Sequence, residues 1–175
     1  STNSDYRNAI ATLNSVDRYI NGLDSVQYGL TSVWLNGNNV DVRSRATNLG
    51  NLIADALLWY AQKLHNDNPN LAAIQSIDVA FVNGGGIRDM IGTEQVMPDE
   101  TVHRNPPEAN PSLDKQAGEI SRLDVLNSLR FDNTLTLGTI SVAQLKRSAE
   151  AMVAEARHGG FGQVSGFSFR YDPTR

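Results

Sequence analysis

The feature that most constrains this chain is an apolar segment, residues 77–82, that runs directly into the sequence NGGGIR at residues 83–88. The apolar segment predicts a buried strand. The three glycines after it can take a positive φ and let the backbone approach a ligand, and their successive N–H groups can form a nest for an anion. We therefore expect an anion site in which Arg88 supplies the charge. A tight turn with a purely structural role is the alternative.

The usual nucleotide-binding loops do not fit this segment. A dinucleotide-binding fingerprint that begins at Gly84 needs a glycine at position 89, where the chain has Asp89. A phosphate-binding loop needs Lys followed by Ser or Thr after its last glycine, and the chain has neither there. Both motifs are therefore excluded at this position.

Composition limits the classes of protein that remain. The 175 residues suit one domain of ordinary size, and the net charge of −4 offers no basic surface for nucleic acid. The chain has no cysteine, which excludes disulfides, thiolate metal ligands and a cysteine nucleophile. No apolar run reaches the length of a bilayer span, and the polar start lacks the features of a signal peptide. We expect no nucleic-acid partner and no membrane span, and we expect the chain to be part of a longer protein.

Apolar spacing and capping residues predict helices in four places. The predicted helices are residues 5–23; a helix from Thr47 or Asn48 to about His65, with Leu52, Ile53, Ala56, Leu57 and Tyr60 on its apolar face; a short helix begun by Ser121 or Asp124; and a helix that Ser141 begins and Gly159-Gly160 ends.

Four regions read as strands, so the fold class is mixed α and β, that is α/β. They are residues 26–42, as two strands joined by a hairpin at 36–39; residues 77–82; residues 134–137; and residues 161–171. Residues 89–118 hold several prolines and charges with almost no periodic apolar signal, which predicts a long surface loop that is mobile or is ordered only by packing against a neighbour.

Five motifs follow one another along the chain, at residues 43–56, 83–88, 118–120, 131–135, and 163–166 with 171–173. Their sequences and their order closely resemble the C-terminal substrate-binding domain of the 5′-nucleotidase family. That family includes UDP-sugar hydrolases and 2′,3′-cyclic nucleotide phosphodiesterases. The resemblance implies a layered α/β/β/α domain over residues 26–175, preceded by a hinge or linker helix region over residues 1–25. The family domain continues into a Gly-Gly-Asp-Gly-Phe motif that this chain does not reach, so we expect the domain to be incomplete at its C-terminus.

The resemblance implies a role in an exported hydrolase. In the family, an N-terminal metallophosphatase domain holds a two-metal centre, and the C-terminal domain grips the nucleoside and swings to present its phosphate. We therefore expect a nucleotide or nucleoside ligand, a catalytic domain in the same protein with divalent metals such as Zn or Mn, and a periplasmic, secreted or cell-surface location. The chain itself has scattered histidines without ligand spacing, so we expect no cofactor, metal ligand or catalytic residue in it, and no activity from it alone.

The resemblance also assigns ligand roles to individual residues. Arg43 and Arg88 are similar to the arginines that hold the substrate phosphate, and Asn83 is similar to the amide near the ribose and base. Phe131 resembles one of two aromatic rings that stack on the base. Asn133 resembles a polar contact to the edge of the base.

Three further residues carry ligand roles with open alternatives. Arg45 is a second candidate cation, but it could equally pair with a carboxylate in solvent. Gly85 belongs to the predicted anion nest. Gly160 could lie against the ligand or simply end a helix. For Phe131 the alternative is a core ring, although the charged residues on either side of it favour exposure.

A non-enzymatic ligand-binding or surface-interaction module that keeps the fold is the alternative function. The joint presence of Asn83, Arg88, Phe131 and Asn133 argues against a module that has lost its ligand. Departures from the family pattern, including the length of residues 89–118, leave open whether the substrate is a monophosphate, a diphosphate sugar or a cyclic nucleotide.

Overall fold

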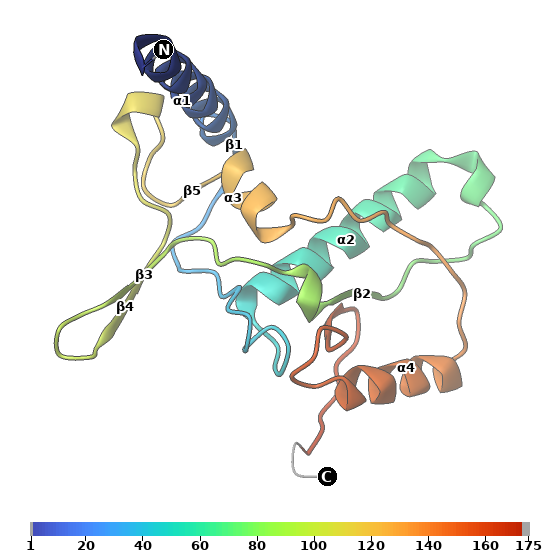
Figure 1. Ribbon diagram of the computed structural model, residues 1–175. Helices are drawn as coiled ribbons and strands as arrows, with labels where there is room; N and C mark the ends of the chain where they lie inside the picture. Colours follow the sequence, from blue (N-terminus) through green and yellow to red (C-terminus); the bar gives the residue numbers. More distant parts are fainter. Residues whose placement is uncertain (1, 173–175) are drawn as a thin grey trace. The chain divides into compact units, whose positions relative to one another are not determined.

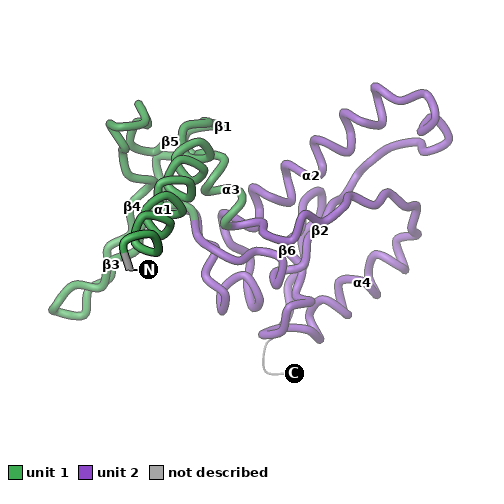
Figure 2. The backbone as a smooth tube through the Cα atoms, turned by 45° about the horizontal axis from the view of Figure 1, so that its top comes forward, with its two compact units in different colours: residues 1–34, 91–127 green, residues 35–90, 128–175 purple. Residues whose placement is uncertain are grey.

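The protein divides into two compact units in the computed structural model, which describes residues 2–172. Residues 1–34 and 91–127 form unit 1, and residues 35–90 and 128–175 form unit 2 (Figure 2). Within the described residues, the strands pair antiparallel in twos and are accompanied by helices (Figure 1). The predicted mixed α and β class is confirmed. Pro173 of the C-terminal motif lies outside the described residues.

Unit 1 contains a long helix and two strand pairs. The predicted first helix is confirmed as α1, and β1 pairs with β5 across a large sequence separation. The strands β3 and β4 form a hairpin. The elements of unit 1 are α1 (Thr2–Asp24), β1 (Gln27–Leu30), β3 (Thr93–Val96), β4 (Val102–Asn105), a 3-10 helix (Pro111–Leu113), β5 (Glu119–Ser121) and most of α3 (Arg122–Ser128).

The hairpin predicted at residues 36–39 is wrong, because the asparagines there bind neighbouring backbone. The Asn36 side chain accepts from the Asn38 N–H at 2.9 Å, and the Asn38 side chain accepts from the Val40 N–H at 2.9 Å. Asn36 Nδ2 also donates to Asp41 at 2.8 Å. Such local side-chain bonds offer the backbone an alternative to a strand ladder.

The prediction that residues 89–118 form one long surface loop is also wrong, because this region contains the β3–β4 hairpin. A cross-strand ion pair joins Arg104 Nε to Glu94 at 2.7 Å. The Arg104 guanidinium also lies 4.6 Å from the ring centroid of Trp34. The ion pair and the contact with the Trp34 ring therefore stabilise β3 and β4. These strands have too few apolar residues to be predicted from apolar periodicity.

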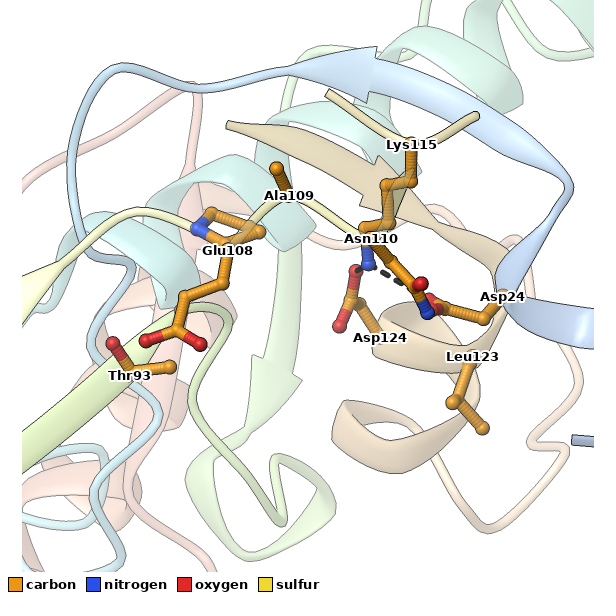
Figure 3. A pocket seen from close by; sticks show the side chains of 10 residues that line it. Asp24, Thr93, Glu108, Ala109, Asn110, Lys115, Leu123 and Asp124 are labelled. Carbon is orange, nitrogen blue, oxygen red and sulfur yellow. Dashed lines mark hydrogen bonds and ion pairs between the residues drawn. The ribbon is translucent and has the colours of Figure 1, made fainter. Parts of the chain in front are cut away.

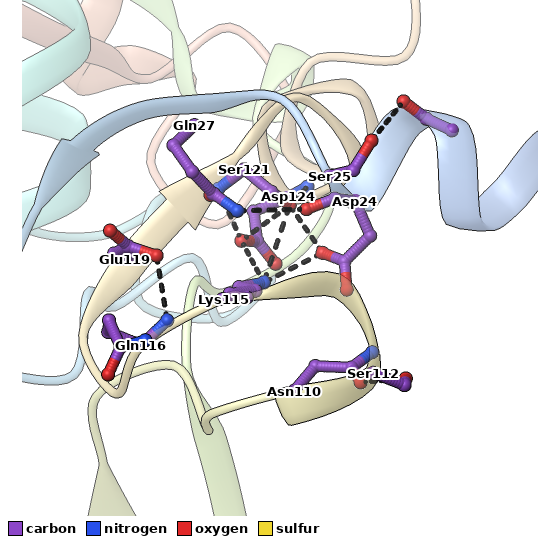
Figure 4. Close-up of polar contacts among 11 residues, drawn as sticks. Asp24, Ser25, Gln27, Asn110, Ser112, Lys115, Gln116, Glu119, Ser121 and Asp124 are labelled. Atoms are coloured by element: carbon purple, nitrogen blue, oxygen red, sulfur yellow. Dashed lines mark hydrogen bonds and ion pairs between the residues drawn. The ribbon is translucent and has the colours of Figure 1, made fainter.

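A buried lysine holds unit 1 together near the end of α1 (Figure 4). Lys115 is 6% exposed, and its Nζ lies 2.7 Å from Asp24 Oδ1 and 3.1 Å from Asp124 Oδ2. Ser121 Oγ donates to the same Asp24 oxygen at 2.7 Å. The bonds therefore join the last residue of α1 to the start of α3, where the Ser121 N–H also donates to Asp124 at 2.8 Å.

This cluster keeps its members charged. Burial by itself would raise the pKa of Asp24, but hydrogen bonds from Lys115 and Ser121 and the lysine charge hold that pKa below its ordinary value. Burial would likewise lower the pKa of Lys115, and the bonds to Asp24 and Asp124 raise it instead. The ion pair between Lys115 and Asp24 therefore forms in the pH range between the pKa of Asp24 and the pKa of Lys115.

Unit 2 packs two helices against one strand pair. The ribbon of β2 and β6 lies between α2 and α4, with α2 in contact with both strands (Figure 2). Both predicted helix starts are confirmed: Thr47 Oγ1 accepts from the Gly50 N–H at 3.0 Å, and Ser141 forms a capping box with Gln144. The elements of unit 2 are α2 (Asn48–Asp67), a 3-10 helix (Pro69–Leu71), β2 (Ala80–Asn83), a 3-10 turn (Gly84–Gly86), α4 (Val142–Ala154) and β6 (Gly162–Ser165).

Several details of unit 2 differ from the sequence-based expectation. Residues 134–137 form no strand, with residues 134–136 exposed and Leu137 half-buried, and the strand predicted over residues 161–171 is limited to β6. The helix α4 ends at Ala154, before the two glycines expected to end it. The buried face of α2 is Leu49, Ile53, Ala54 and Ala61, whereas Leu52 and Tyr60 of the predicted face are exposed.

None of the helices in residues 2–172 combines the length and the apolar character needed to cross a bilayer.

We expect Lys115→Met to destabilise the protein strongly. The substitution leaves two mostly buried carboxylates without their counter-charge, which should lower the free energy of unfolding by about 3 kcal/mol at neutral pH. Urea unfolding measures this loss. Because the folded-state pKa of Asp24 is depressed, the contribution of the Lys115–Asp24 pair is full above about pH 4 and is lost as the pH falls through that depressed pKa.

The matched control is Lys63→Met, which removes an exposed pair with Asp67 on one helix and should leave the unfolding midpoint nearly unchanged. Equal effects of the two substitutions, or a Lys115→Met deficit that persists undiminished at acid pH, would contradict this account.

Candidate functional site

The glycine segment does not form the predicted anion nest. Gly84, Gly85 and Gly86 make a 3-10 turn, and none of the three has a positive φ. The Gly84 N–H donates to the Phe161 carbonyl at 2.6 Å, and the Gly85 N–H donates to the Gly159 carbonyl at 2.9 Å. These donors are already used inside the protein, so the expectation that they bind an anion is wrong.

The glycines are needed for close backbone packing instead. A Cβ atom at Gly84 would lie 1.9 Å from the Val42 carbonyl oxygen, and one at Gly85 would lie 2.7 Å from the Gly159 Cα. Real side chains do not fit at such distances, and the obstacle in both cases is backbone. Only glycine therefore allows the segments around residues 42, 84 and 159 to meet.

Arg88 follows this turn and lies over an exposed aromatic ring. Its backbone N–H donates to the Ser128 carbonyl at 2.9 Å, and its Nη1 lies 3.4 Å from the Gly85 carbonyl oxygen. The guanidinium carbon is 5.5 Å from the centroid of the Phe131 ring. Arg88 has no carboxylate partner among residues 2–172. The pair thus presents a free positive charge beside an aromatic surface.

Phe131 is a surface ring, as the flanking charges predict. Its exposure is 56%, so the alternative of a core ring is wrong. The next residue, Asp132, has a φ of +49°, and no regular structure follows until α4. Asn133 lies in this exposed stretch.

The two arginines of the preceding loop differ in their surroundings. Arg43 is half-buried, and its Nε is buried without a hydrogen-bond partner among the described residues. Arg45 is exposed and pairs with Asp41 at 2.7 Å. The hydrogen bond and charge of Asp41 raise the pKa of Arg45 above its ordinary value. The structure therefore shows Arg45 in a solvated ion pair with a carboxylate, which was the alternative to a ligand-binding role for this residue.

Asn83 and Gly160 border the same turn. Asn83 Nδ2 donates to the Gly159 carbonyl at 3.2 Å. Gly160 is exposed, and a Cβ there would lie 2.8 Å from Cγ of Glu155. Because α4 ends at Ala154, the alternative in which Gly160 ends that helix is wrong.

Hydrogen bonds gather four chain segments of unit 2 around these residues. The Arg157 N–H donates to the Arg43 carbonyl at 2.6 Å, which links residues 42–45 to residues 157–161. The N–H groups of Gly84 and Gly85 bond the glycine turn to residues 159–161. The bond from the Arg88 N–H to the Ser128 carbonyl adds the segment that carries Phe131. The sequence predicted that Gly159 helps to end a helix, and it gave no signal of the bond from the Gly85 N–H to the Gly159 carbonyl. No function was predicted for any member of the motif at residues 163–166.

A separate pocket of about 330 Å³ lies in unit 1 and contains none of the predicted residues (Figure 3). Its carboxylates are Asp24, Asp124 and Glu108, and the first two are engaged by Lys115. Three carboxylates against one lysine disfavour an anionic ligand. The candidate site for a phosphate is therefore the Arg88 and Phe131 surface of unit 2.

Comparison with known proteins identifies the family. Residues 27–175 match the family described as "5'-nucleotidase, C-terminal domain", and the chain belongs to that family. The trifunctional nucleotide phosphoesterase protein YfkN of Bacillus subtilis is 30% identical over 161 residues, which are 89% of this chain and 9% of that protein. The snake venom 5′-nucleotidase of Crotalus adamanteus is 31% identical over 169 residues, which are 94% of this chain and 24% of that protein.

A solved structure gives the same result. The crystal structure of the 5′-nucleotidase precursor from Thermus thermophilus aligns with a TM-score of 0.56 at 27% identity, over 90% of this chain and 25% of that chain. The predicted family and fold class are confirmed. The chain spans only 9% to 25% of the length of these relatives.

The exposure of Phe131 predicts that this ring contributes little to stability. Phe131→Ala should change the free energy of unfolding by less than about 1 kcal/mol, since few contacts are lost at the surface. Phe161, which is 2% exposed, is the matched control, and Phe161→Ala should cost about 3–5 kcal/mol. Denaturant unfolding of both variants tests this difference. A loss for Phe131→Ala as large as that for Phe161→Ala would place Phe131 in the core.

Proposed function

We propose that this domain binds the nucleotide substrate of a 5′-nucleotidase-type phosphoester hydrolase and positions its phosphate for a two-metal centre in another domain of the same protein. The observation that carries the proposal is the pairing of Arg88 with the exposed ring of Phe131 at 5.5 Å. One side chain offers a planar cation for phosphate. The other offers a flat apolar face for a base.

Two further features support a ligand at this place. Arg43 keeps a buried Nε without a partner among the described residues, and a buried unpaired donor costs about 1–3 kcal/mol unless a ligand or water satisfies it. The names of the relatives, a nucleotide phosphoesterase and a 5′-nucleotidase, fit the same ligand class.

In this proposal the domain contributes orientation rather than bond cleavage. Base stacking on Phe131 is worth about 1–3 kcal/mol, and Asn133 contacts the edge of the base. Arg43 and Arg88 hold the phosphate, and Asn83 lies near the ribose. Fixing the phosphate makes the hydrolytic attack effectively intramolecular. Divalent metals such as Zn or Mn in the catalytic domain would polarise the phosphoryl oxygens.

We also propose that the whole protein acts outside the cytoplasm, in the periplasm, at the cell surface or as a secreted enzyme. This rests on the resemblance, and the venom origin of several relatives agrees with it.

Arg88→Ala in the protein that contains both domains should lower kcat/KM by about 10- to 100-fold, because a charge-assisted bond to phosphate is worth roughly 1.5–3 kcal/mol. Folding should be little changed, since Arg88 is exposed and makes no ion pair among residues 2–172. Steady-state kinetics on several nucleotides measures the effect.

Arg45→Ala is the matched control, because Arg45 is also exposed but is already paired with Asp41. It should reduce kcat/KM much less than Arg88→Ala. Wild-type kcat/KM for Arg88→Ala on every nucleotide tested would refute the phosphate assignment and favour a non-enzymatic binding module.

This chain alone should have no phosphatase activity when Zn²⁺, Mn²⁺ or Mg²⁺ is added. Residues 2–172 contain no group of three or more His, Asp or Glu side chains that could hold a metal ion. A phosphatase assay on repurified chain tests the expectation. Activity that co-purifies with the chain through successive columns would show that it carries its own catalytic centre.

A further inference from the structure

One buried side chain holds the loop that carries Arg43. Gln163, in β6, is 1% exposed. Its Nε2 donates to the Val42 carbonyl at 2.9 Å and to the Arg45 carbonyl at 2.7 Å. Its Oε1 accepts from the Thr47 N–H at 3.1 Å. A single amide therefore binds backbone groups on both sides of Arg43.

The remaining carbonyls of this loop are bound as well. The Arg43 carbonyl accepts from the Arg157 N–H at 2.6 Å, and the Ser44 carbonyl accepts from the Tyr171 hydroxyl. Four consecutive carbonyls, those of residues 42–45, thus accept hydrogen bonds from the C-terminal part of unit 2. Gln163 makes two of these four bonds, and it also accepts a bond from the Thr47 N–H at the end of the loop.

The strand that carries Gln163 also connects to Arg88. In the β2–β6 ladder, Gln163 lies opposite Val82 and Gly162 lies opposite Asn83. The glycine turn and Arg88 follow directly in the chain. Gln163 therefore couples the backbone of the Arg43 loop to the strand pair from which the Arg88 segment extends.

We propose that Gln163 is a positioning residue that fixes Arg43 relative to Arg88 and thereby sets recognition of the substrate phosphate. This inference rests on the proposed function. Gln163 itself does not touch the ligand. Its buried amide is suited to the task because its donors and its acceptor are all used on one loop, so the loop cannot shift without leaving buried polar groups unpaired.

A neighbouring residue provides a matched control. Ser165, also buried in β6, donates to Asp55 of α2 at 2.5 Å and makes no bond to residues 42–47. Ser165→Ala removes a buried hydrogen bond from the same strand, and Gln163→Met removes the bonds to the Arg43 loop at similar side-chain volume. Loss of stability alone would affect both variants in the same way.

Gly50→Ala offers a second route to the same perturbation. A Cβ at Gly50 would lie 2.2 Å from Gln163 Oε1, so the methyl group must push the amide away from the loop. This variant leaves Gln163 in the chain. It keeps the test available if Gln163→Met does not fold.

The experiment is a titration of the isotope-labelled chain with adenosine and with adenosine 5′-monophosphate, followed by nuclear magnetic resonance. The dissociation constant for adenosine divided by that for adenosine 5′-monophosphate reports how much the phosphate adds to binding. We expect Gln163→Met and Gly50→Ala each to lower this ratio by about tenfold, with adenosine affinity nearly unchanged. Ser165→Ala should leave the ratio at its wild-type value.

The possible outcomes distinguish a failure of the positioning role of Gln163 from a failure of the proposed function. A wild-type ratio in folded Gln163→Met, or in Gly50→Ala, overturns the positioning role while the proposed function stands. An equal drop in Ser165→Ala overturns it too, because the effect would then follow stability. A ratio of one in the unsubstituted chain overturns the proposed function itself.

Discussion

The direct approach of three backbone segments in unit 2 determines where every candidate ligand residue lies. Gly84 meets the Val42 carbonyl and Gly85 meets the Gly159 backbone at distances that exclude any side chain. Because the Gly84 and Gly85 N–H groups donate to backbone carbonyls in this contact, they are not available to bind an anion. In the proposed function, phosphate recognition is therefore assigned to two side chains that extend from the packed turn and loop, Arg88 and Arg43.

The two units use charge in different ways. In unit 1, Lys115 is buried between two carboxylates, and its ion pairs connect the end of α1 to the start of α3. In unit 2, Arg88 is exposed, and its guanidinium lies beside the Gly85 carbonyl and the Phe131 ring with no ion pair among residues 2–172. In a protein of net charge −4, such a cation is a candidate for a local anion site and is not part of a general basic surface.

Local signals predicted the helices, because caps such as Thr47 and Ser141 act within one helical turn. The charged residues next to Phe131 likewise predicted that its ring is exposed. Pairing between distant segments could not be predicted in the same way. The partner of β1 is β5, and the partner of the glycine turn is residues 159–161. A run of glycines reads equally as a positive-φ nest and as a close backbone contact, and only the tertiary neighbours distinguish the two. The resemblance supplied the candidate site residues, and their roles in binding stay predictions.

In the proposed function a nucleotide contacts unit 2 at Arg88 and Phe131. The most direct test of this contact is a titration of the ¹⁵N-labelled chain with adenosine 5′-monophosphate, observing backbone amides and arginine Nε–H signals together. We expect shifts at the Arg88 side chain and at residues 131–133. Shifts confined to the unit 1 pocket around Asp24 and Glu108, with Arg88 unmoved at saturation, would contradict it.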